Sequence, residues 1–491
     1  MVNKLDNDIF ENIFDFVQKK HEISYFDIKF LRRSYQSLMV KNDVVEENNF
    51  SRNMGIGVRV LSQDAWGFAA TNNLSSKKEL LAIVDQAVRI AQASSKTAKK
   101  PVTLTNENVN IDSYTTPYQI DPEKIELEEK ISFLIDCTKN SALNDSRIKV
   151  RTANLTSWKD FMMFWNSEGS RIEQEIIVTG AGVSTVAVDK GEAITRSLPA
   201  SFRGDYATAG YEFVKEMDLI NCAKQSAQQS LQILEAEKCP QTETSVILLP
   251  SQLMLQVHES CGHPTELDRA LDYEAAFAGT SFLKPHLLKE EFYYGNENVT
   301  MTQDATVPRG LGTFGYDHEG VKAQRKLLVD KGRFVGYLSS RETAMQIGEN
   351  HSSGSMRADF WNHIPIIRMT NVSLEPGDWD YDEIVQDTKE GIIMDTNKSW
   401  SIDDLRLNFQ FSTEIGWLIK NGEITKTIKT PSYYGITPRF WGSCSGVTKQ
   451  KYWKIMGTPN CGKGEPSQIM YTGHGSAPAR FENVKIGIVR L

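Results

Sequence analysis

The alternation of hydrophobic and polar positions divides the first half of the chain into helices and strands. Apolar residues recur three and four positions apart, as on one face of a helix, in residues 7–20, 76–93, a segment that starts at 121, and 218–235. Strict alternation with glycine-rich turns, which is typical of strands, fills residues 23–71 and 148–205. We therefore predict helices packed on a mostly antiparallel sheet, an α+β arrangement.

The second half has a different pattern. A buried strand is predicted at 246–249, followed by a short helix at 252–262 and a further helix near 270–290. From there almost to the C-terminus, alternating strands, glycines and aromatic residues predominate. This half is therefore predicted to be rich in strands, with the helix at 252–262 as its main helical feature.

The length of the chain fits two units of this kind. At 491 residues it exceeds one ordinary domain, and residues 238–243 have the composition of a linker. We expect an N-terminal α+β domain over 1–240 and a β-rich C-terminal domain over 241–491.

Charge and hydropathy exclude some classes of partner. The chain has 55 Lys and Arg against 63 Asp and Glu, so it lacks the basic surplus of a large nucleic-acid interface. No apolar run approaches the roughly 18 residues of a membrane span. Residues 1–20 alternate acidic and apolar positions, unlike a signal peptide. We expect a cytoplasmic protein without direct contact to nucleic acid or membrane.

Cysteine and histidine are scarce, with 6 and 8 copies, and no C-x-x-C pair occurs. A disulfide framework and a zinc ribbon are therefore not expected. These residue types cluster in one segment, where Cys261 stands between His258 and His263, and Glu259 follows His258. A His-Glu pair on a helix is typical of zinc hydrolases, in which two histidines bind the metal and the glutamate is the general base.

The spacing of this motif is unusual, because it reads H-E-x-x-x-H rather than H-E-x-x-H. In an undistorted α-helix, positions five apart differ by about 140° around the axis, so His258 and His263 would point apart. Gly262 permits unusual backbone angles, and Pro264 disfavours the α conformation of His263. The sequence therefore predicts a π-bulge, or a break at 261–262, that brings the two histidines together.

A catalytic zinc needs three protein ligands and one open position, so one ligand must come from elsewhere. The candidates are Cys261, Cys461, Glu266, His318 and His474. Cys461 lies in a predicted glycine-flanked loop, where Lys463 would favour the thiolate. Three of the other candidates have simpler interpretations: Cys261 as a small buried helix residue, His318 as part of a tight turn, and His474 as part of a surface loop. Cys444 is interpreted as part of a structural loop.

Several motifs together resemble the TldD/PmbA family, specifically its TldD-like zinc metalloprotease branch, whose members were historically called modulators of DNA gyrase. The similarity runs nearly end to end. It is carried by the H-E-x-x-x-H site and by residues 57–61 (GVRVL), 67–72 (GFAATN), 317–321 (DHEGV), 368–371 (RMTN) and 461–463 (CGK). Two positions depart from the TldD pattern: Pro264 replaces the usual glycine after the second histidine, and Gln468 lies two residues later than usual.

The resemblance implies zinc-dependent cleavage of peptides or unfolded protein segments. It places zinc on His258, His263 and Cys461, with Glu259 activating the zinc-bound water. It also implies a dimer, either of this chain alone or with a PmbA-like (TldE) chain that lacks the metal motif. Because this chain keeps the motif, the resemblance makes it the catalytic partner.

Two other functions remain open from the sequence. A non-catalytic peptide-binding or regulatory subunit would carry a structural metal site, for which Glu259 has no use. A cysteine hydrolase would use Cys461 or Cys444 as its nucleophile and would be insensitive to chelators.

Overall fold

The computed structural model describes residues 10–17, 19, 23–277 and 279–487. The expected first helix over 7–20 is helical at 10–17, and its positions 7–9, 18 and 20 lie outside the described residues.

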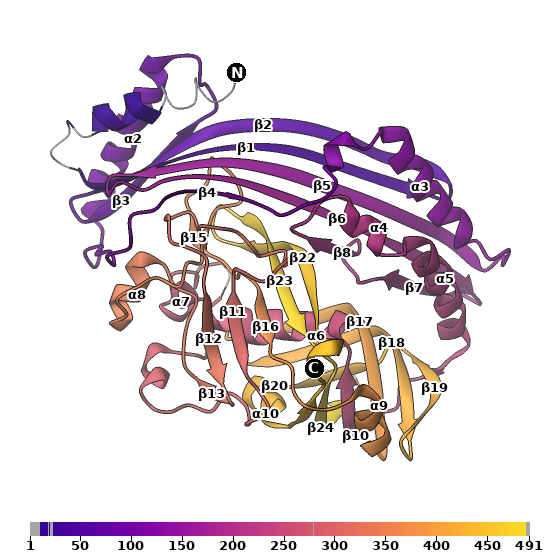
Figure 1. Cartoon of the computed structure of the whole chain (residues 1–491). Helices are drawn as coiled ribbons and strands as arrows, with labels where there is room; N and C mark the ends of the chain where they lie inside the picture. Colours follow the sequence, from indigo (N-terminus) through magenta and orange to yellow (C-terminus); the bar gives the residue numbers. More distant parts are fainter. Residues whose placement is uncertain (1–9, 18, 20–22, 278, 488–491) are drawn as a thin grey trace.

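A long, curved sheet dominates the first half and arches over the second half (Figure 1). The neighbouring strands β3, β2, β1, β5 and β6 are antiparallel, as the alternating pattern predicted, whereas β4 is parallel to β6. In sheet order the strands are β3 (Ala65–Thr71), β2 (Val44–Ser62), β1 (Ile23–Lys41), β5 (Ile148–Asn166), β6 (Arg171–Asp189) and β4 (Ile111–Thr115), with β7 (Glu192–Leu198) and β8 (Asp205–Ala207) paired to β6.

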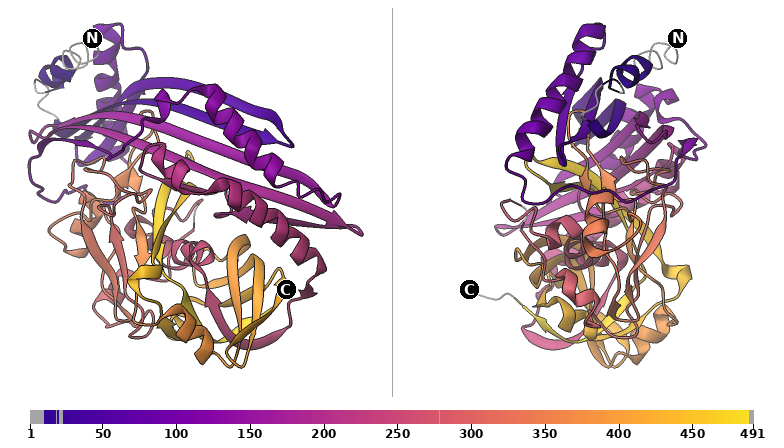
Figure 2. Two further views of the ribbon diagram at one scale, coloured as in Figure 1. Left: turned by 45° about the vertical axis from the view of Figure 1, so that its right-hand side comes forward. Right: turned by 90° about the vertical axis from the view of Figure 1, so that its left-hand side faces the viewer.

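Helices cover the outer face of this sheet, and the second half lies under its inner face (Figures 1 and 2). Phe26, Ile28 and Phe30 of β1 point to the outer face and pack in one apolar cluster with α2 and residues 10–17. None of the helices in the described part of the chain is long and apolar enough to cross a membrane. Besides the helical residues 10–17, this half contains the helices α2 (Lys77–Ser95), α3 (Leu127–Asn140), α4 (Glu212–Glu216) and α5 (Leu219–Glu235).

The helix predicted from residue 121 begins later than expected. Asp121 caps a short 3-10 turn, Pro122–Lys124, by accepting a hydrogen bond from the Glu123 N–H. Ile125 is then extended, with φ −86° and ψ 127°, and the α-helix begins at Leu127.

The second half is built on a sheet that contains both antiparallel and parallel strand pairs, in agreement with the predicted β-rich character. Its strands are, in order, β17 (Glu390–Ile402), β10 (Thr242–Leu248), β24 (Ala479–Ile486), β20 (Ser432–Ile436), β18 (Asn408–Lys420), β19 (Glu423–Lys429) and β9 (Glu237–Lys238), with β21 (Cys444–Val447) on β24. Smaller sheets join β13 (Arg333–Phe334), β12 (Arg325–Asp330), β11 (Met301–Asp304) and β16 (Val372–Leu374); β14 (Met356–Arg357) and β15 (Ile366–Ile367); and β22 (Lys454–Lys463) and β23 (Gln468–Ser476).

The predicted helix near 270–290 is wrong. Among the described residues of this segment, which leave out position 278, only α7 (Leu267–Ala270) and a 3-10 turn at Pro285–Leu288 are helical. Asp272 and Gly279 have left-handed φ values of +67° and +84°, which an α-helix cannot accommodate. The remaining helices of this half are α6 (Pro250–Val257), α8 (Arg341–Ile347), α9 (Tyr381–Asp387) and α10 (Thr437–Gly442).

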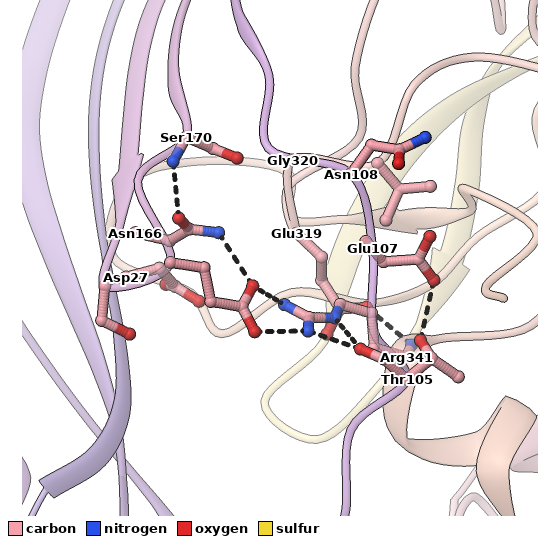
Figure 3. Close-up of polar contacts among 12 residues, drawn as sticks. Asp27, Thr105, Glu107, Asn108, Asn166, Ser170, Glu319, Gly320 and Arg341 are labelled. Carbon is pink, nitrogen blue, oxygen red and sulfur yellow. Dashed lines mark hydrogen bonds and ion pairs between the residues drawn. The ribbon is translucent and has the colours of Figure 1, made fainter. Parts of the chain in front are cut away.

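A buried polar network joins the two halves (Figure 3). Glu319 accepts hydrogen bonds from Arg59 of β2 (3.2 Å) and from the Arg341 N–H at the start of α8 (2.8 Å). The Arg341 guanidinium also binds Glu168 in the β5–β6 turn, at 2.7 and 2.8 Å, and the carbonyl of Thr105. Glu319 lies in a tight turn, closed by the Gly320 N–H donating to the Asp317 carbonyl, as the sequence predicted. This turn therefore fastens the second half to the sheet.

Candidate metal centre

The two motif histidines lie on a π-helical turn, His258–Gly262, that continues α6. The His263 N–H donates to the His258 carbonyl, five residues earlier, which is the hydrogen-bond pattern of a π-helix. The imidazole rings consequently lie side by side, with centroids 4.8 Å apart and planes at 90°. The predicted π-bulge is confirmed.

The reasons given for this distortion need correction. Gly262 has ordinary helical angles, φ −57° and ψ −62°, and so does His263 despite the following Pro264. A Cβ at position 262 would lie 2.1 Å from Sδ of Met369, so any other residue there would force the Met369 side chain to move. The close contact with Met369, rather than backbone freedom, explains this glycine.

Cys461 comes to the histidines from the far end of the chain. It lies in β22, opposite Met470 of β23, and not in the loop that its flanking glycines indicated. Its Sγ is 3.7 Å from Nε2 of His263, and one ligand atom from each of His258, His263 and Cys461 lies within 4.8 Å of the other two. The structure thus brings together the three residues that were predicted as ligands.

Both histidines are held by a partner on the second ring nitrogen. Nδ1 of His263 is 2.9 Å from Oε2 of Glu266, and Nδ1 of His258 is 2.8 Å from Nε2 of His474. His474 itself is fixed by its Nδ1, 2.9 Å from the Val372 carbonyl. Because these contacts occupy Nδ1 of each ring, Nε2 is the nitrogen that each histidine can offer to a metal. His474 is fully buried, so the prediction of a surface loop is wrong.

Glu266 is a completely buried carboxylate at the centre of a charged cluster. Besides His263, it has Arg269 Nε at 3.4 Å and Lys463 Nζ at 3.5 Å. Burial alone would raise the pKa of Glu266, but Lys463 and His263 hold it well below its usual value. Lys463 also binds both carboxylate oxygens of Asp268, at 2.7 and 2.8 Å. Glu266 is therefore ionised and orients His263.

The surroundings of the three grouped residues favour the protonation states that bind metals. Burial opposes ionisation of the Cys461 thiol, but Arg368 and His263 outweigh it, so its pKa lies below the usual value. The cation that favours the thiolate is thus Arg368, whereas the sequence pointed to Lys463. Burial lowers the pKa of His258 and of His263, which favours the neutral imidazole. Thiolate and neutral imidazole are the forms that bind metals.

Glu259 is buried next to His258 and is held by an ion pair. Nη1 of Arg406 donates to its Oε2 at 2.7 Å. Burial lowers the pKa of Arg406, and the Glu259 charge counteracts this. Arg406 lies between β17 and β18, and no motif of the sequence pointed to it.

The other candidates lie outside the group of three. Cys261 belongs to the main apolar core of the second half, where burial raises the pKa of its thiol. Cys444 is buried in the same core on β21, and burial raises its pKa to about 12, which agrees with a structural role. His318 lies at the junction of the two halves, where its Nδ1 accepts from the Ala358 N–H (2.9 Å) and is 3.4 Å from Nζ of Lys29.

Lys29 gives a pH-dependent prediction. Burial lowers its pKa to about 7, although Asp27 and Asp359 counteract this. In the unfolded chain its pKa is about 10.4, so between about pH 7 and 10 the unfolded state binds more protons and stability falls as the pH is lowered. Lys29→Met is expected to raise the free energy of unfolding by on the order of 2–4 kcal/mol at pH 7 and by less than half of that at pH 9.5.

Urea denaturation at the two pH values measures this difference. Lys190→Met is the matched control, because the Lys190 side chain is 90% exposed and should give no pH-dependent difference. An equal effect of Lys29→Met at both pH values would contradict a lowered pKa for Lys29.

Comparison with known proteins finds relatives along the whole chain. Sequence models of PmbA/TldA metallopeptidases match as domain 1 over residues 26–91, as the central domain over 120–234 and as the C-terminal domain over 241–487. A metalloprotease of Methanocaldococcus jannaschii is 32% identical over 421 residues, covering 85% of this chain and 88% of the relative.

More distant relatives extend the similarity. A zinc metalloprotease TldD homolog of Saccharolobus solfataricus is 22% identical over 484 residues, 97% of this chain and 99% of its own. The crystal structure of TldE from Thermococcus kodakarensis has a TM-score of 0.74 at 16% identity and covers 98% of this chain and 100% of its own, which shows a shared fold.

Proposed function

The chain belongs to the TldD/PmbA family of metallopeptidases, and we propose that it is a zinc-dependent peptidase that cleaves peptides or unfolded protein segments. The observation that carries the proposal is the convergence of His258, His263 and Cys461 from opposite ends of the second half. Glu259 follows His258 and acts on it electrostatically. A structural site would be expected to have four protein ligands, whereas three leave a position open for water.

The residues present fit zinc. Two imidazole nitrogens and a thiolate are donors that zinc prefers. Bonds of 2.0–2.3 Å in a tetrahedral arrangement would separate the donors by roughly 3.5 Å, close to the 3.7 Å between His263 Nε2 and Cys461 Sγ. When bound, zinc would polarise the substrate carbonyl and lower the pKa of water.

The chain's own residues supply the remaining steps of the proposed reaction. Glu259 accepts the proton of the attacking water and returns it to the leaving amine. Arg406 holds the Glu259 carboxylate in place through Oε2. Glu266 and His474 fix the two imidazoles, so that their Nε2 atoms keep their direction.

The test is metal analysis combined with digestion of an unfolded peptide mixture. We expect about one zinc per chain, cleavage that a chelator abolishes, and recovery when zinc is added back. Hydrolysis that resists chelators but stops with a thiol reagent would select a cysteine hydrolase. Bound metal without hydrolysis would select a binding or regulatory subunit.

We also propose that the active form is a dimer, either of this chain or with a PmbA/TldE-like chain, and that the chain divides into domains near residue 240. The family relationship supports both points. Light scattering of the purified chain, alone and with such a partner, tests the first of them.

Replacing Glu266 tests the proposed ligand geometry without removing a ligand. Glu266→Gln keeps the shape but not the charge that holds His263, so we expect zinc affinity to fall about 10–100-fold. Competition with a zinc-binding dye measures this change. Glu274→Gln is the matched control, because the Glu274 carboxylate accepts a hydrogen bond from the Gly464 N–H at 3.2 Å rather than from a histidine. Equal zinc affinity in the Glu266 variant would contradict an orienting role.

A further inference from the structure

A cavity of about 580 Å³ lies between the hairpin β22–β23 and the inner face of the long sheet. Figure 1 shows the hairpin reaching up from the second half to this face. The cavity is walled by Tyr35 of β1 and Trp158 of β5 above, and by Ile469 and Tyr471 of β23 below. Phe202, before β8, closes one side.

The hairpin connects this cavity with the metal centre. Paired residues of a hairpin lie on the same face, and neighbours in a strand lie on opposite faces. Cys461 and Met470 are paired and buried, so they share the face that meets the histidines. Ile469 and Tyr471, which flank Met470, therefore lie on the opposite face and form the floor of the cavity.

Aromatic and apolar side chains form a large part of the cavity walls. The Trp158 ring has its centroid 6.4 Å from that of Tyr35, 6.3 Å from Tyr206 and 5.3 Å from Tyr471. Ile469 is 58% exposed, although it is a large apolar side chain beside an open cavity. Burying such surfaces against an apolar ligand is favourable, by about 25 cal/mol per Å².

Each charged residue that lines the cavity has a polar partner outside the lining. Arg33 binds both oxygens of Asp160, at 2.6 Å each. Asp359 accepts the Ile469 N–H at 3.1 Å and contacts His363. Arg203 at the rim is 3.5 Å from Glu47 of β2. With Arg33 and Arg203 paired to carboxylates and the Asp359 carboxylate hydrogen-bonded, the cavity favours an uncharged apolar group over an acidic or basic one.

We infer that this cavity is a substrate subsite that takes a large apolar or aromatic side chain of an extended peptide. The inference rests on the proposed peptidase function. The cavity and the metal centre lie on opposite faces of the hairpin, and an extended peptide advances about 3.3 Å per residue. The selected residue is therefore separated from the cleaved bond by at least one other residue of the peptide.

The first experiment measures cleavage preference. The zinc-loaded full chain digests a peptide mixture, and mass spectrometry of the products gives residue frequencies around each cut. We expect large apolar residues to be enriched at one position that is not adjacent to the cut. The ratio of kcat/KM for a Phe peptide over its Gly counterpart should fall about tenfold in Ile469→Ser and in Tyr35→Ala.

Ile424→Ser is the matched control, because Ile424 of β19 is 50% exposed and lies outside the cavity. It should keep the preference of the parent chain. Cleavage with no positional preference, or an unchanged ratio in both cavity variants, would overturn the subsite and leave the proposed function standing.

The second experiment is independent of turnover. In the full chain carrying Glu259→Gln, fluorescence anisotropy compares the Kd of labelled Phe and Gly peptides. We expect the Phe peptide to bind about tenfold more tightly, and Ile469→Ser to remove this difference. If the parent chain cleaves no peptide, the proposed function is wrong, and the subsite is then decided by this binding measurement alone. Equal Kd values for the Phe and Gly peptides would overturn the subsite.

Discussion

Glu259→Gln is expected to abolish peptide cleavage while the chain keeps its zinc. Glutamine keeps the size of the side chain and an oxygen that Arg406 can bind, but it cannot accept a proton. Loss of a general base typically costs 10²–10⁴-fold, so we expect kcat to fall by about that factor. Because Glu259 is not among the three grouped ligand residues, the zinc content should not change.

Single-turnover cleavage of a fluorogenic peptide, together with metal analysis of the same preparation, measures both quantities. Glu274→Gln is the control for replacing a partly buried glutamate in the second half, and it should keep activity. A Glu259 variant that retains more than about a tenth of the activity would exclude Glu259 as the base. A variant that loses zinc would instead give Glu259 a role in holding the metal.

The local pattern of the sequence was sufficient to predict the architecture of the first half. Alternation over 23–71 and 148–205 corresponds to long antiparallel strands, because one face of each strand meets helices and the other meets the second half. The helix expected near 270–290 does not form, because local sequence does not determine the backbone angles there. Its apolar and helix-forming residues follow α7, but Asp272 and Gly279 adopt left-handed angles that local propensity did not reveal.

The candidate site was predictable where chemistry and spacing coincide. The five-residue separation of His258 and His263 has a metal-binding geometry only on a π-helical turn, and this turn is present. Contacts between segments that are distant in the chain could not be predicted from the local sequence. Arg368 beside Cys461 and Arg406 beside Glu259 are set by tertiary packing, and His474 was assigned to the surface because no local pattern marks its burial.

Cys461→Ala is expected to remove both the zinc and the activity. Cys461 is the one thiolate of the proposed ligand set, and its pKa is held down by Arg368 and His263. Without it, two neutral imidazoles remain beside Arg368, an arrangement that disfavours a cation. The loss of zinc affinity should exceed the roughly 10–100-fold that removal of an orienting partner costs.

Cys261→Ala is the decisive comparison for this variant. Cys261 is also a fully buried cysteine, and it lies between the two histidines in sequence, but its side chain packs in the apolar core. It should lose some stability and keep its zinc, since a small buried side chain is shortened without loss of a ligand. If the Cys461 variant retained zinc and the Cys261 variant lost it, Cys261 rather than Cys461 would be the third ligand. Zinc lost from the Cys461 variant alone would place the metal between the π-helical turn and β22, where the two ends of the second half meet.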